Sequence, residues 1–577
     1  MDPPSPESPP LVSRANSSNY IHFTPKRAMA SFENLVALAN YEERLREARK
    51  VIWRDRGEKP VELDDLWECL EHAARGGWRA GGLGFAIRSG VNLILLLVRM
   101  DRIPKRLRFS VIRQALFGED SLRFASMLGS FVALYKFILN ALPIILPEPR
   151  PRRPLNYTST FDEGDDVDTD VLPPNARHLS NRRARLSTSA QQHQVWIRKK
   201  TRRWYSIAAG SLAGAFAIMM EKRSNRTGIA QQMFVRGLQG SYNAFSQKHG
   251  IHIPHGDVMV FGLCCAQIMY AFLLRHDTLP KGYLNWIFAA AKVPREAVMI
   301  NKDLVREGTF KLSDIDRVLN RKDITPHNRA ELLVRRALAT LPSDPDYGTR
   351  FVPCAATHPW LDSCLLTQVH RYFVVTKWIL PVYAALHFIP MILFKRGVVM
   401  KYPTRMFMKA ALGALRSSSF LGVFVVIYQS FFCWKHNTYL TLSRLRSGSL
   451  PSPTSQFPGL PSLPYLLSLV ARRLPQSFVD LFISKFSFWF GGLLTGFSLF
   501  VEEKRRREEL AMYVLPKALE SAWVMARGKG LVFGMGEWGD VILTAVGMGM
   551  VMNTYQNDPQ HLSGLVRRIL YQFIGPN

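Results

Sequence analysis

Long apolar stretches alternate along this chain with strongly charged connectors. A helix needs roughly 17 to 25 mostly apolar residues to cross a bilayer, and the stretches approach or reach that length, although several are short or interrupted. They cover residues 78–98, 122–146, 204–220, 258–274, 372–394, 411–434, 482–501 and 541–555. The pattern therefore predicts an all-α integral membrane protein.

Two halves of the chain carry the same residue pattern. Residues 122–135 and 415–428 are identical at eight of fourteen positions, at an offset of 415 − 122 = 293. Two further blocks return in the same order, 210–223 as 492–505 and 256–258 as 539–541. Ordered matches of this kind indicate an ancestral duplication, so we expect two duplicated bundles of about four transmembrane helices each. Duplicated membrane domains commonly place a transport site between the copies.

Shifts in composition divide the chain into segments. Residues 1–30 are rich in Pro and Ser, which predicts a disordered N-terminus. The remaining segments are an amphipathic or soluble helical region (31–77), a first membrane repeat (78–275) with a linker (147–200), a soluble helical bridge (276–350), and a second membrane repeat (351–577) with a loop (447–464). In the bridge we expect a short helix over residues 311–319, with Ser313 as its N-cap.

Basic residues gather beside the apolar stretches. The formal net charge is +30, and much of the excess lies in residues 99–108, 182–203 and 504–507. This distribution predicts contact with anionic lipid headgroups and control of membrane topology. It argues against nucleic acid as a partner, because no surface for base stacking is interleaved with the basic runs. Ser187 follows a run of arginines and is a candidate phosphorylation site, with a solvated tail that faces the headgroups as the alternative.

Small residues recur at helical spacing in the second block of each copy. Gly210 and Gly214 in the first copy correspond to Gly492 and Gly496 in the second. Two small residues four positions apart allow helix backbones to approach closely in lipid. These four glycines therefore predict helix packing.

Each glycine segment ends in the sequence Glu-Lys-Arg, which begins at Glu221 and at Glu503. Charge at the end of a span commonly anchors a helix at the membrane surface. Alternatively, the two carboxylates lie inside the bundle, where they must pair with cations. Arg88 and Lys377 fall inside the first apolar stretch of each copy and are the candidate partners, so these four residues are the candidate polar lining of a pathway.

The cysteines do not predict a disulfide framework, because the six of them are few and irregularly spaced. Cys354, His358 and Cys364 are weak candidates for a metal site, and Cys69 with His72 is a faint counterpart in the first copy. Structural zinc requires four ligands, and the sequence offers no obvious fourth. We therefore predict no metal and no cofactor.

Familiar catalytic motifs are absent from the sequence. It contains no GxxxxGK[ST], G-x-S-x-G or H-E-x-x-H pattern. We therefore predict that the protein is not an enzyme. The remaining enzyme hypothesis is a lipid-modifying enzyme that uses His358 and Cys364.

The Cys-x3-His-Pro-Trp element that begins at Cys354 and the Arg-Arg-Glu-Glu-x-x-x-Tyr element of residues 506–513 resemble the transmembrane protein 135 family, also called a peroxisomal membrane protein. The resemblance covers most of residues 350–577 and, more weakly, 60–290. The glycine-rich helices are also distantly similar to those of the mitochondrial inner-membrane translocase superfamily.

This resemblance implies a multi-pass protein of the mitochondrial or peroxisomal membrane, or of both, that influences mitochondrial fission, organelle dynamics and lipid metabolism. Its implied partners are organelle-division or lipid-handling proteins, and it implies no catalytic residue. The alternative function is a transporter or translocation channel with its pathway between the two repeats. Whether the chain forms a homo-oligomer is left open.

Overall fold

The computed structural model describes residues 63, 65–98, 104, 108–146, 203–251, 253–341, 345–394, 396–448 and 463–575. Helices fill most of these residues, and no strand occurs among them. Residues 1–30, the linker 147–200 with Ser187, and most of the loop 447–464 lie outside the described residues. The all-helical fold that was predicted from the sequence is therefore observed where the chain is described.

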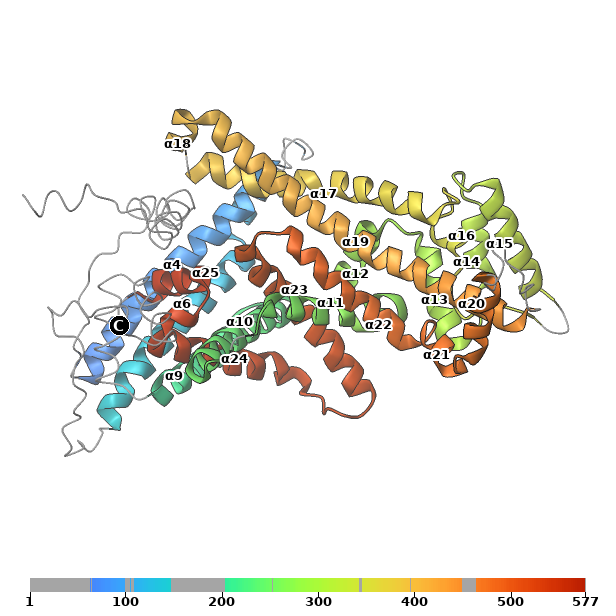
Figure 1. Ribbon diagram of the computed structural model, residues 1–577. Coiled ribbons are helices and arrows are strands. Elements are labelled where there is room, and N and C mark those ends of the chain that lie inside the picture. The colour runs from blue at the N-terminus through green and yellow to red at the C-terminus, as the bar shows by residue number, and fades with distance from the viewer. Residues whose placement is uncertain are drawn as a thin grey trace, which may run out of the picture.

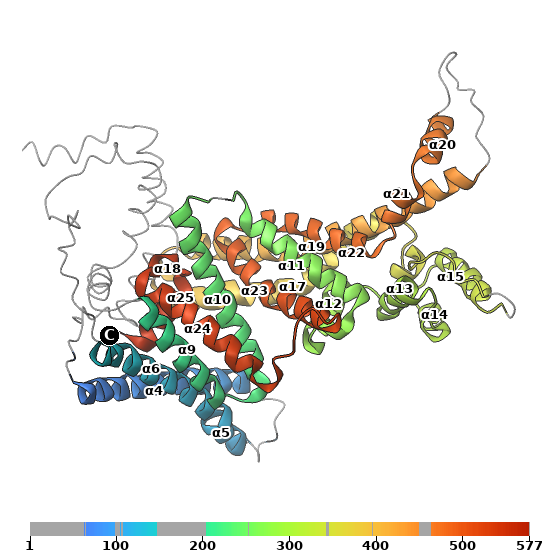
Figure 2. The ribbon, with the colours of Figure 1, turned by 90° about the horizontal axis from the view of Figure 1, so that it is seen from below.

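The helices have the following bounds in chain order: α4 (Leu66–Val98), α5 (Arg108–Phe117), α6 (Glu119–Ile145), α9 (Arg203–Met220), α10 (Arg223–His249), α11 (Gly256–Leu274), η3 (His276–Thr278), α12 (Lys281–Ala291), α13 (Arg295–Glu307), α14 (Leu312–Leu319), α15 (Pro326–Ala339), α16 (Cys354–Thr357), α17 (Cys364–Phe394), α18 (Arg396–Lys401), α19 (Pro403–Ser447), α20 (Leu463–Arg473), α21 (Gln476–Leu481), α22 (Lys485–Leu494), η4 (Thr495–Val501), α23 (Lys504–Gly528), η5 (Gly536–Trp538), α24 (Gly539–Asn557), η6 (Pro559–His561) and α25 (Gly564–Ile574). The molecule is elongated, with α13–α15 at one end and α4, α6 and α9 at the other (Figures 1 and 2).

Two pairs of long helices pack side by side. Helix α4 packs along α6, and α17 packs along α19. Small residues allow the first pair to approach closely, since a Cβ added to Gly77 would lie 2.7 Å from the Ala133 Cβ and 2.9 Å from the Gly129 carbonyl oxygen. In the second pair, Gly422 of α19, which aligns with Gly129, lies against Thr376 and Tyr372 of α17.

The other helices pair across the two halves of the chain. Helices α9 and α10 pack against α24, and α11 packs against α22, η4 and α23. Figure 2 shows α9, α10 and α24 side by side. Each half therefore contributes helices to the contacts of the other. The segments 78–275 and 351–577 do not form two separate bundles in the described part of the chain, because this exchange interlocks them.

Four helical segments in the described residues are long and apolar enough to cross a membrane: Arg108–Ile145, Gly256–Leu274, Cys364–Ile389 and Pro403–Ser447. Lys485–Val501 is apolar but shorter. The other predicted spans lie in α4, α9 and α24, which are not among these four segments; Arg88 lies within α4, Arg203 begins α9, and Asn553 lies near the end of α24.

Helix α17 presents an exposed apolar face. Leu365, Phe373, Leu386 and Ile389 are each more than half exposed, and they recur along the helix. An apolar surface of this kind on a long helix is typical of a lipid contact. The face supports membrane association of α17.

The bridge between the halves is helical, as the sequence indicated, but its capping differs. Helix α14 begins at Leu312 with Lys311 as its N-cap residue, so Ser313 lies inside the first turn and the capping prediction was wrong. In the next helix, α15, Thr325 is the N-cap residue, and its hydroxyl accepts a hydrogen bond from the backbone amide of Asn328 at 3.2 Å. Pro326 occupies the first turn.

Candidate functional site

Four potential metal ligands converge where α16, α17 and α19 meet. Cys354, His358 and Cys364 come from one short segment, and Cys433 comes from the middle of α19. Their ligand atoms all lie within 4.8 Å of one another, and the Cys364 Sγ lies 3.4 Å from the His358 Nε2. The three residues that were weak candidates in the sequence are therefore joined by a fourth.

The fourth residue was missed because it is distant in sequence. Cys433 lies 433 − 364 = 69 positions after Cys364, inside an apolar helix that gives no local ligand spacing. Only the packing of α17 along α19 brings the two together. The reduced cysteines Cys264 and Cys69 lie outside this cluster.

Backbone contacts orient the histidine of the cluster. The His358 Nδ1 lies 2.7 Å from the Leu361 carbonyl oxygen and donates to it, which leaves Nε2 facing Cys364. The side-chain amide of the buried residue Asn328, on α15, donates to the carbonyl oxygens of Pro359 and Leu361 at 3.1 and 3.2 Å. The ring and its loop are thus held in one geometry.

The cluster favours positive charge. Burial alone lowers the pKa of His358, but hydrogen bonds with Cys364 and Cys433 and with the Leu361 carbonyl outweigh burial and raise the pKa to about 10. A buried arginine, Arg371, which is 1% exposed, lies beside the cluster. Its guanidinium donates to the Thr357 carbonyl at 2.8 Å and lies 5.4 Å from the Trp360 ring centre.

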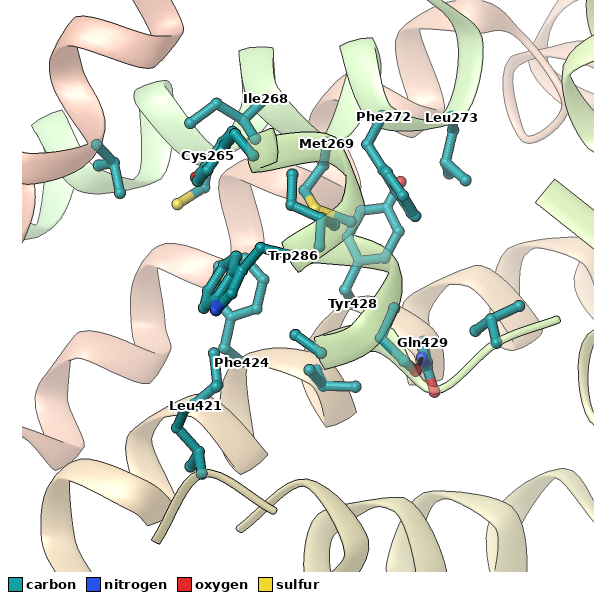
Figure 3. A pocket seen from close by; sticks show the side chains of 18 of the residues that line it. Cys265, Ile268, Met269, Phe272, Leu273, Trp286, Leu421, Phe424, Tyr428 and Gln429 are labelled. Carbon is teal, nitrogen blue, oxygen red and sulfur yellow. Dashed lines mark hydrogen bonds between the residues drawn. The ribbon is translucent and has the colours of Figure 1, made fainter. Parts of the chain in front are cut away.

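A cavity of about 450 Å³ lies beside the cluster. Side chains from α11, α12, α13, α17, α19 and α23 line it, and most are apolar. Figure 3 shows Met269, Trp286, Phe424 and Tyr428 around the space. Both halves of the chain contribute to this lining, and Cys433 belongs to it. The cavity therefore borders the cysteine cluster at Cys433.

A second, polar pocket of about 370 Å³ lies near the same place. Lys292, Arg321, His370 and Arg371 contribute to its lining, and the Arg321 guanidinium is paired with Asp323 at 2.7 Å. Burial lowers the pKa of Lys292. The lining nevertheless carries a positive excess, because Lys292, Arg321 and Arg371 stand against the carboxylate of Asp323. Val293 contacts both this pocket and the apolar cavity.

The four candidate packing glycines all lie at close helix contacts. An added Cβ would lie 2.8 Å from the Met548 carbonyl oxygen at Gly210, and 2.8 Å from the Met548 Cβ at Gly214. It would lie 2.6 Å from the Ala266 Cα at Gly492, and 2.9 Å from the Gly262 Cα at Gly496. These glycines hold α9 against α24, and α22 with η4 against α11.

Glu221 is buried at the junction of α9 and α10. Its Oε1 accepts hydrogen bonds from the Lys222 amide at 3.1 Å and the Asn225 side chain at 3.0 Å. The Arg226 side chain donates to the Glu221 backbone carbonyl at 2.9 Å and to that of Met219 at 2.6 Å. This carboxylate therefore stabilises the turn between α9 and α10, and it is not paired with Arg88 or Lys377.

Three of these four contacts recur in the second half at Glu502, and Arg506, whose Nη1 lies 3.6 Å from the Glu502 Oε1, takes the place of Asn225. Its Oε1 accepts from the Glu503 amide at 3.3 Å, and Arg507 donates to the carbonyl oxygens of Glu502 and Phe500 at 3.0 and 3.1 Å. Glu503, which the sequence aligned with Glu221, is instead half-exposed and lies 3.1 Å from the Arg416 Nη1. The structural counterpart of Glu221 is Glu502.

A change of helix type explains the one-residue difference. From Gly210 to Glu221 the chain advances 221 − 210 = 11 residues, and from Gly492 to Glu502 it advances 502 − 492 = 10 residues. The second segment contains the 3₁₀ helix η4. Because a 3₁₀ helix rises about 2.0 Å per residue against about 1.5 Å in an α-helix, fewer residues span the same length.

The candidate cations do not join these carboxylates. Arg88 lies 5.9 Å from the centre of the Phe124 ring and interacts electrostatically with Asp120. Lys377 is exposed. Among the described residues no ion pair links either cation to Glu221 or Glu503, so the four residues of the predicted polar lining do not converge.

The faint counterpart in the first half is not a metal cluster. Cys69 is buried in α4, and the His72 Nε2 accepts a hydrogen bond from the Lys136 Nζ at 3.0 Å. Burial, followed by the positive charges of Lys136, Arg79 and Arg75, lowers the pKa of His72 to about 4. His72 is therefore a neutral partner for a lysine.

Comparison with known proteins adds no further constraint: no protein-family model, curated protein or solved structure matches this chain.

Proposed function

We propose that this protein is a multi-pass membrane protein that binds the acyl chain of an anionic lipid in the cavity between α11, α12 and α19. The cavity itself carries the proposal. Its volume of about 450 Å³ lies in the range of roughly 300 to 1,000 Å³ that is usual for small-molecule sites. Its mostly apolar lining favours a hydrocarbon chain over a polar metabolite.

The charge beside the cavity favours an anionic headgroup. Lys292 and Arg371 line the neighbouring pocket, which shares the lining residue Val293 with the cavity. Gln429 lines the cavity and accepts a hydrogen bond from Arg371. A carboxylate or phosphate at this junction would gain charge-assisted hydrogen bonds, while the attached chain fills the apolar space.

Access from the bilayer supports a lipid as the ligand. Val382 and Leu386 line the cavity, and both are also more than half exposed on the outer face of α17. A hydrocarbon chain could therefore pass from the bilayer past α17 without crossing water.

The matched halves favour an origin by duplication followed by exchange of helices. The pairing of α9 with α24 and of α11 with α22 and η4 is reciprocal, and the hydrogen bonds of Glu221 recur at Glu502. In this proposal two copies of one hairpin unit interlock, and the cavity forms where they meet.

The resemblance to the transmembrane protein 135 family extends the proposal to the organelle. We place the protein in the mitochondrial or peroxisomal membrane, where lipid binding would couple it to organelle dynamics and lipid metabolism. The test is co-localisation of a tagged chain with markers of both membranes. Plasma-membrane staining with normal mitochondria and lipid stores in cells that lack the protein would oppose this part.

A second candidate function is lipid transport along a path between the halves. It is favoured by the mixed lining of the cavity, with Met269 from the first half and Leu421 from the second. Reconstituted vesicles would then move a labelled fatty acid faster than protein-free vesicles. Equal rates would leave binding as the function.

The binding proposal is tested by filling the cavity. Leu421 lines it and is buried, so Leu421→Trp should occupy space needed by the ligand and lower the affinity for a fluorescent fatty acid about tenfold or more, which is about 1.4 kcal/mol. The matched control is Leu412→Trp, on an exposed position of the same helix, which should bind as the unmodified protein does.

The same titration tests the headgroup. A fatty acid should bind more tightly than a fatty alcohol of equal length, because only the acid is anionic. Unchanged affinity in Leu421→Trp would contradict the cavity as the site, and equal affinity for acid and alcohol would contradict the charged end.

A further inference from the structure

We propose that Cys354, His358, Cys364 and Cys433 bind one structural zinc ion. Zinc in a tetrahedral site lies about 2.3 Å from sulfur and 2.0 to 2.1 Å from nitrogen, which places sulfur atoms about 3.8 Å apart and sulfur and nitrogen about 3.6 Å apart. The four ligand atoms lie within 4.8 Å of one another, and the Cys364 Sγ is 3.4 Å from the His358 Nε2. Small side-chain movements are sufficient to close this set around an ion.

The ligand set selects the metal. Three thiolates and one imidazole are soft and borderline donors, which favour zinc over calcium or magnesium. Four protein ligands fill a tetrahedral zinc site and leave no position for water or substrate. The site is therefore structural, and it argues against an enzyme that uses His358 and Cys364 as free catalytic groups.

The surroundings of the ligands fit a metal site. The His358 Nδ1 donates to the Leu361 carbonyl at 2.7 Å, so its Nε2 is the nitrogen directed at the cluster. Metal-binding histidines generally make such a contact through the second ring nitrogen, which fixes the ring. The Gln368 Nε2 also donates to the Cys433 Sγ at 3.9 Å.

A buried charge provides an independent argument. Arg371 is 1% exposed, and in the described residues it pairs with no carboxylate; its guanidinium donates to Gln429 and to the Thr357 carbonyl. A buried cation without a counter-charge is costly. One zinc ion with three thiolates carries a net charge of −1, and the Arg371 guanidinium donates to the carbonyl oxygen of Thr357, the residue before His358, at 2.8 Å. The metal cluster would supply the missing negative charge.

The zinc site would join distant parts of the chain. It ties the short segment that holds Cys354, His358 and Cys364 to the middle of α19 at Cys433. Thr357 and Cys433 also line the apolar cavity. The ion would therefore fix part of the cavity wall, and its presence does not depend on what the cavity binds.

The test is the metal content of the full chain, purified in detergent with a reductant and without chelator. We expect one zinc per chain by mass spectrometry of the elements. Cobalt exchanged into the unmodified protein should give the strong visible absorption of tetrahedral thiolate coordination. The double variant Cys354→Ser/Cys433→Ser should lose both signals, whereas Cys264→Ser, which changes a buried cysteine outside the cluster, should keep both.

Because cobalt binding is measured first in the unmodified protein, a variant that fails to fold does not decide the result. Absence of zinc and of the cobalt bands in the unmodified, reduced protein, after addition of either metal, would overturn the proposal. Retention of a full zinc equivalent and an unchanged cobalt spectrum in the double variant would also overturn it.

Discussion

Two buried carboxylates, Glu221 and Glu502, terminate equivalent helices in the two halves. Each accepts the amide of the following residue, and each has its backbone carbonyl bound by an arginine five positions later. The positive end of the next helix favours negative charge at this place. The role of these carboxylates is to close a helix junction.

This assignment predicts which glutamate matters for stability. Glu221→Ala and Glu502→Ala should each lower the free energy of unfolding by about 1 to 3 kcal/mol, because buried donors lose their acceptor. Glu503→Ala should cost at most about 1 kcal/mol, since its ion pair with Arg416 is exposed. Thermal unfolding of the detergent-solubilised variants measures the difference. A larger loss in Glu503→Ala than in Glu502→Ala would restore the alignment expected from the sequence.

His72 predicts a pH dependence of stability. Its pKa is lowered to about 4 by burial and nearby cations, whereas an unfolded histidine titrates near 6.5. The unfolded chain therefore binds the proton more readily, so this contribution to stability is complete above about pH 6.5 and declines as the pH falls toward 4. His72→Gln should flatten the decline in the unfolding temperature between these limits. An identical slope in the variant would contradict the role of His72.

At the scale of elements, the glycine contacts decide how the helices cross. Gly492 has the tightest contact among the four candidate glycines, because an added Cβ meets the backbone of α11 at Ala266, which no side-chain rotation can relieve. Gly492→Ala should lower stability by about 1 to 3 kcal/mol.

The control for that variant is Gly282→Ala. Gly282 lies in the helix α12, and an added Cβ there meets open space, so alanine should be neutral or stabilising by up to about 1 kcal/mol. Unfolding of both variants is followed by circular dichroism. Equal stability of Gly492→Ala and Gly282→Ala would show that the α22 and α11 backbones do not approach so closely.

Local signals in the sequence predicted the helices but not their partners. Apolar runs identified the segments of α6, α11, α17 and α19, since a helix depends mainly on neighbouring residues. The exchange of α9 and α11 between the halves depends on contacts between residues hundreds of positions apart, which periodicity does not encode. For the same reason the sequence did not identify Cys433 as a ligand, because Cys354, His358 and Cys364 lie in a distant segment of the chain. The 3₁₀ segment η4 shifted the register by one residue and moved the buried position from Glu503 to Glu502.

At the scale of the whole molecule, helices from both halves line the apolar cavity. Cys433 and Thr357 are among its lining residues, and the polar pocket with Lys292 shares the lining residue Val293 with it. The exposed apolar face of α17 borders the same space. Under the proposed function, this arrangement would give a bilayer lipid a route, an apolar site and a charged end.

The most direct measurement of the central claim is photo-crosslinking with a diazirine-labelled fatty acid in reconstituted membranes, followed by identification of the labelled residues. The account predicts labelling concentrated on cavity residues of α11, α12 and α19, such as Met269, Trp286 and Phe424, and suppressed by unlabelled fatty acid. Labelling confined to the outer face of α17, at Leu365 and Phe373, and insensitive to competitor would contradict it, because the lipid would then contact only the surface.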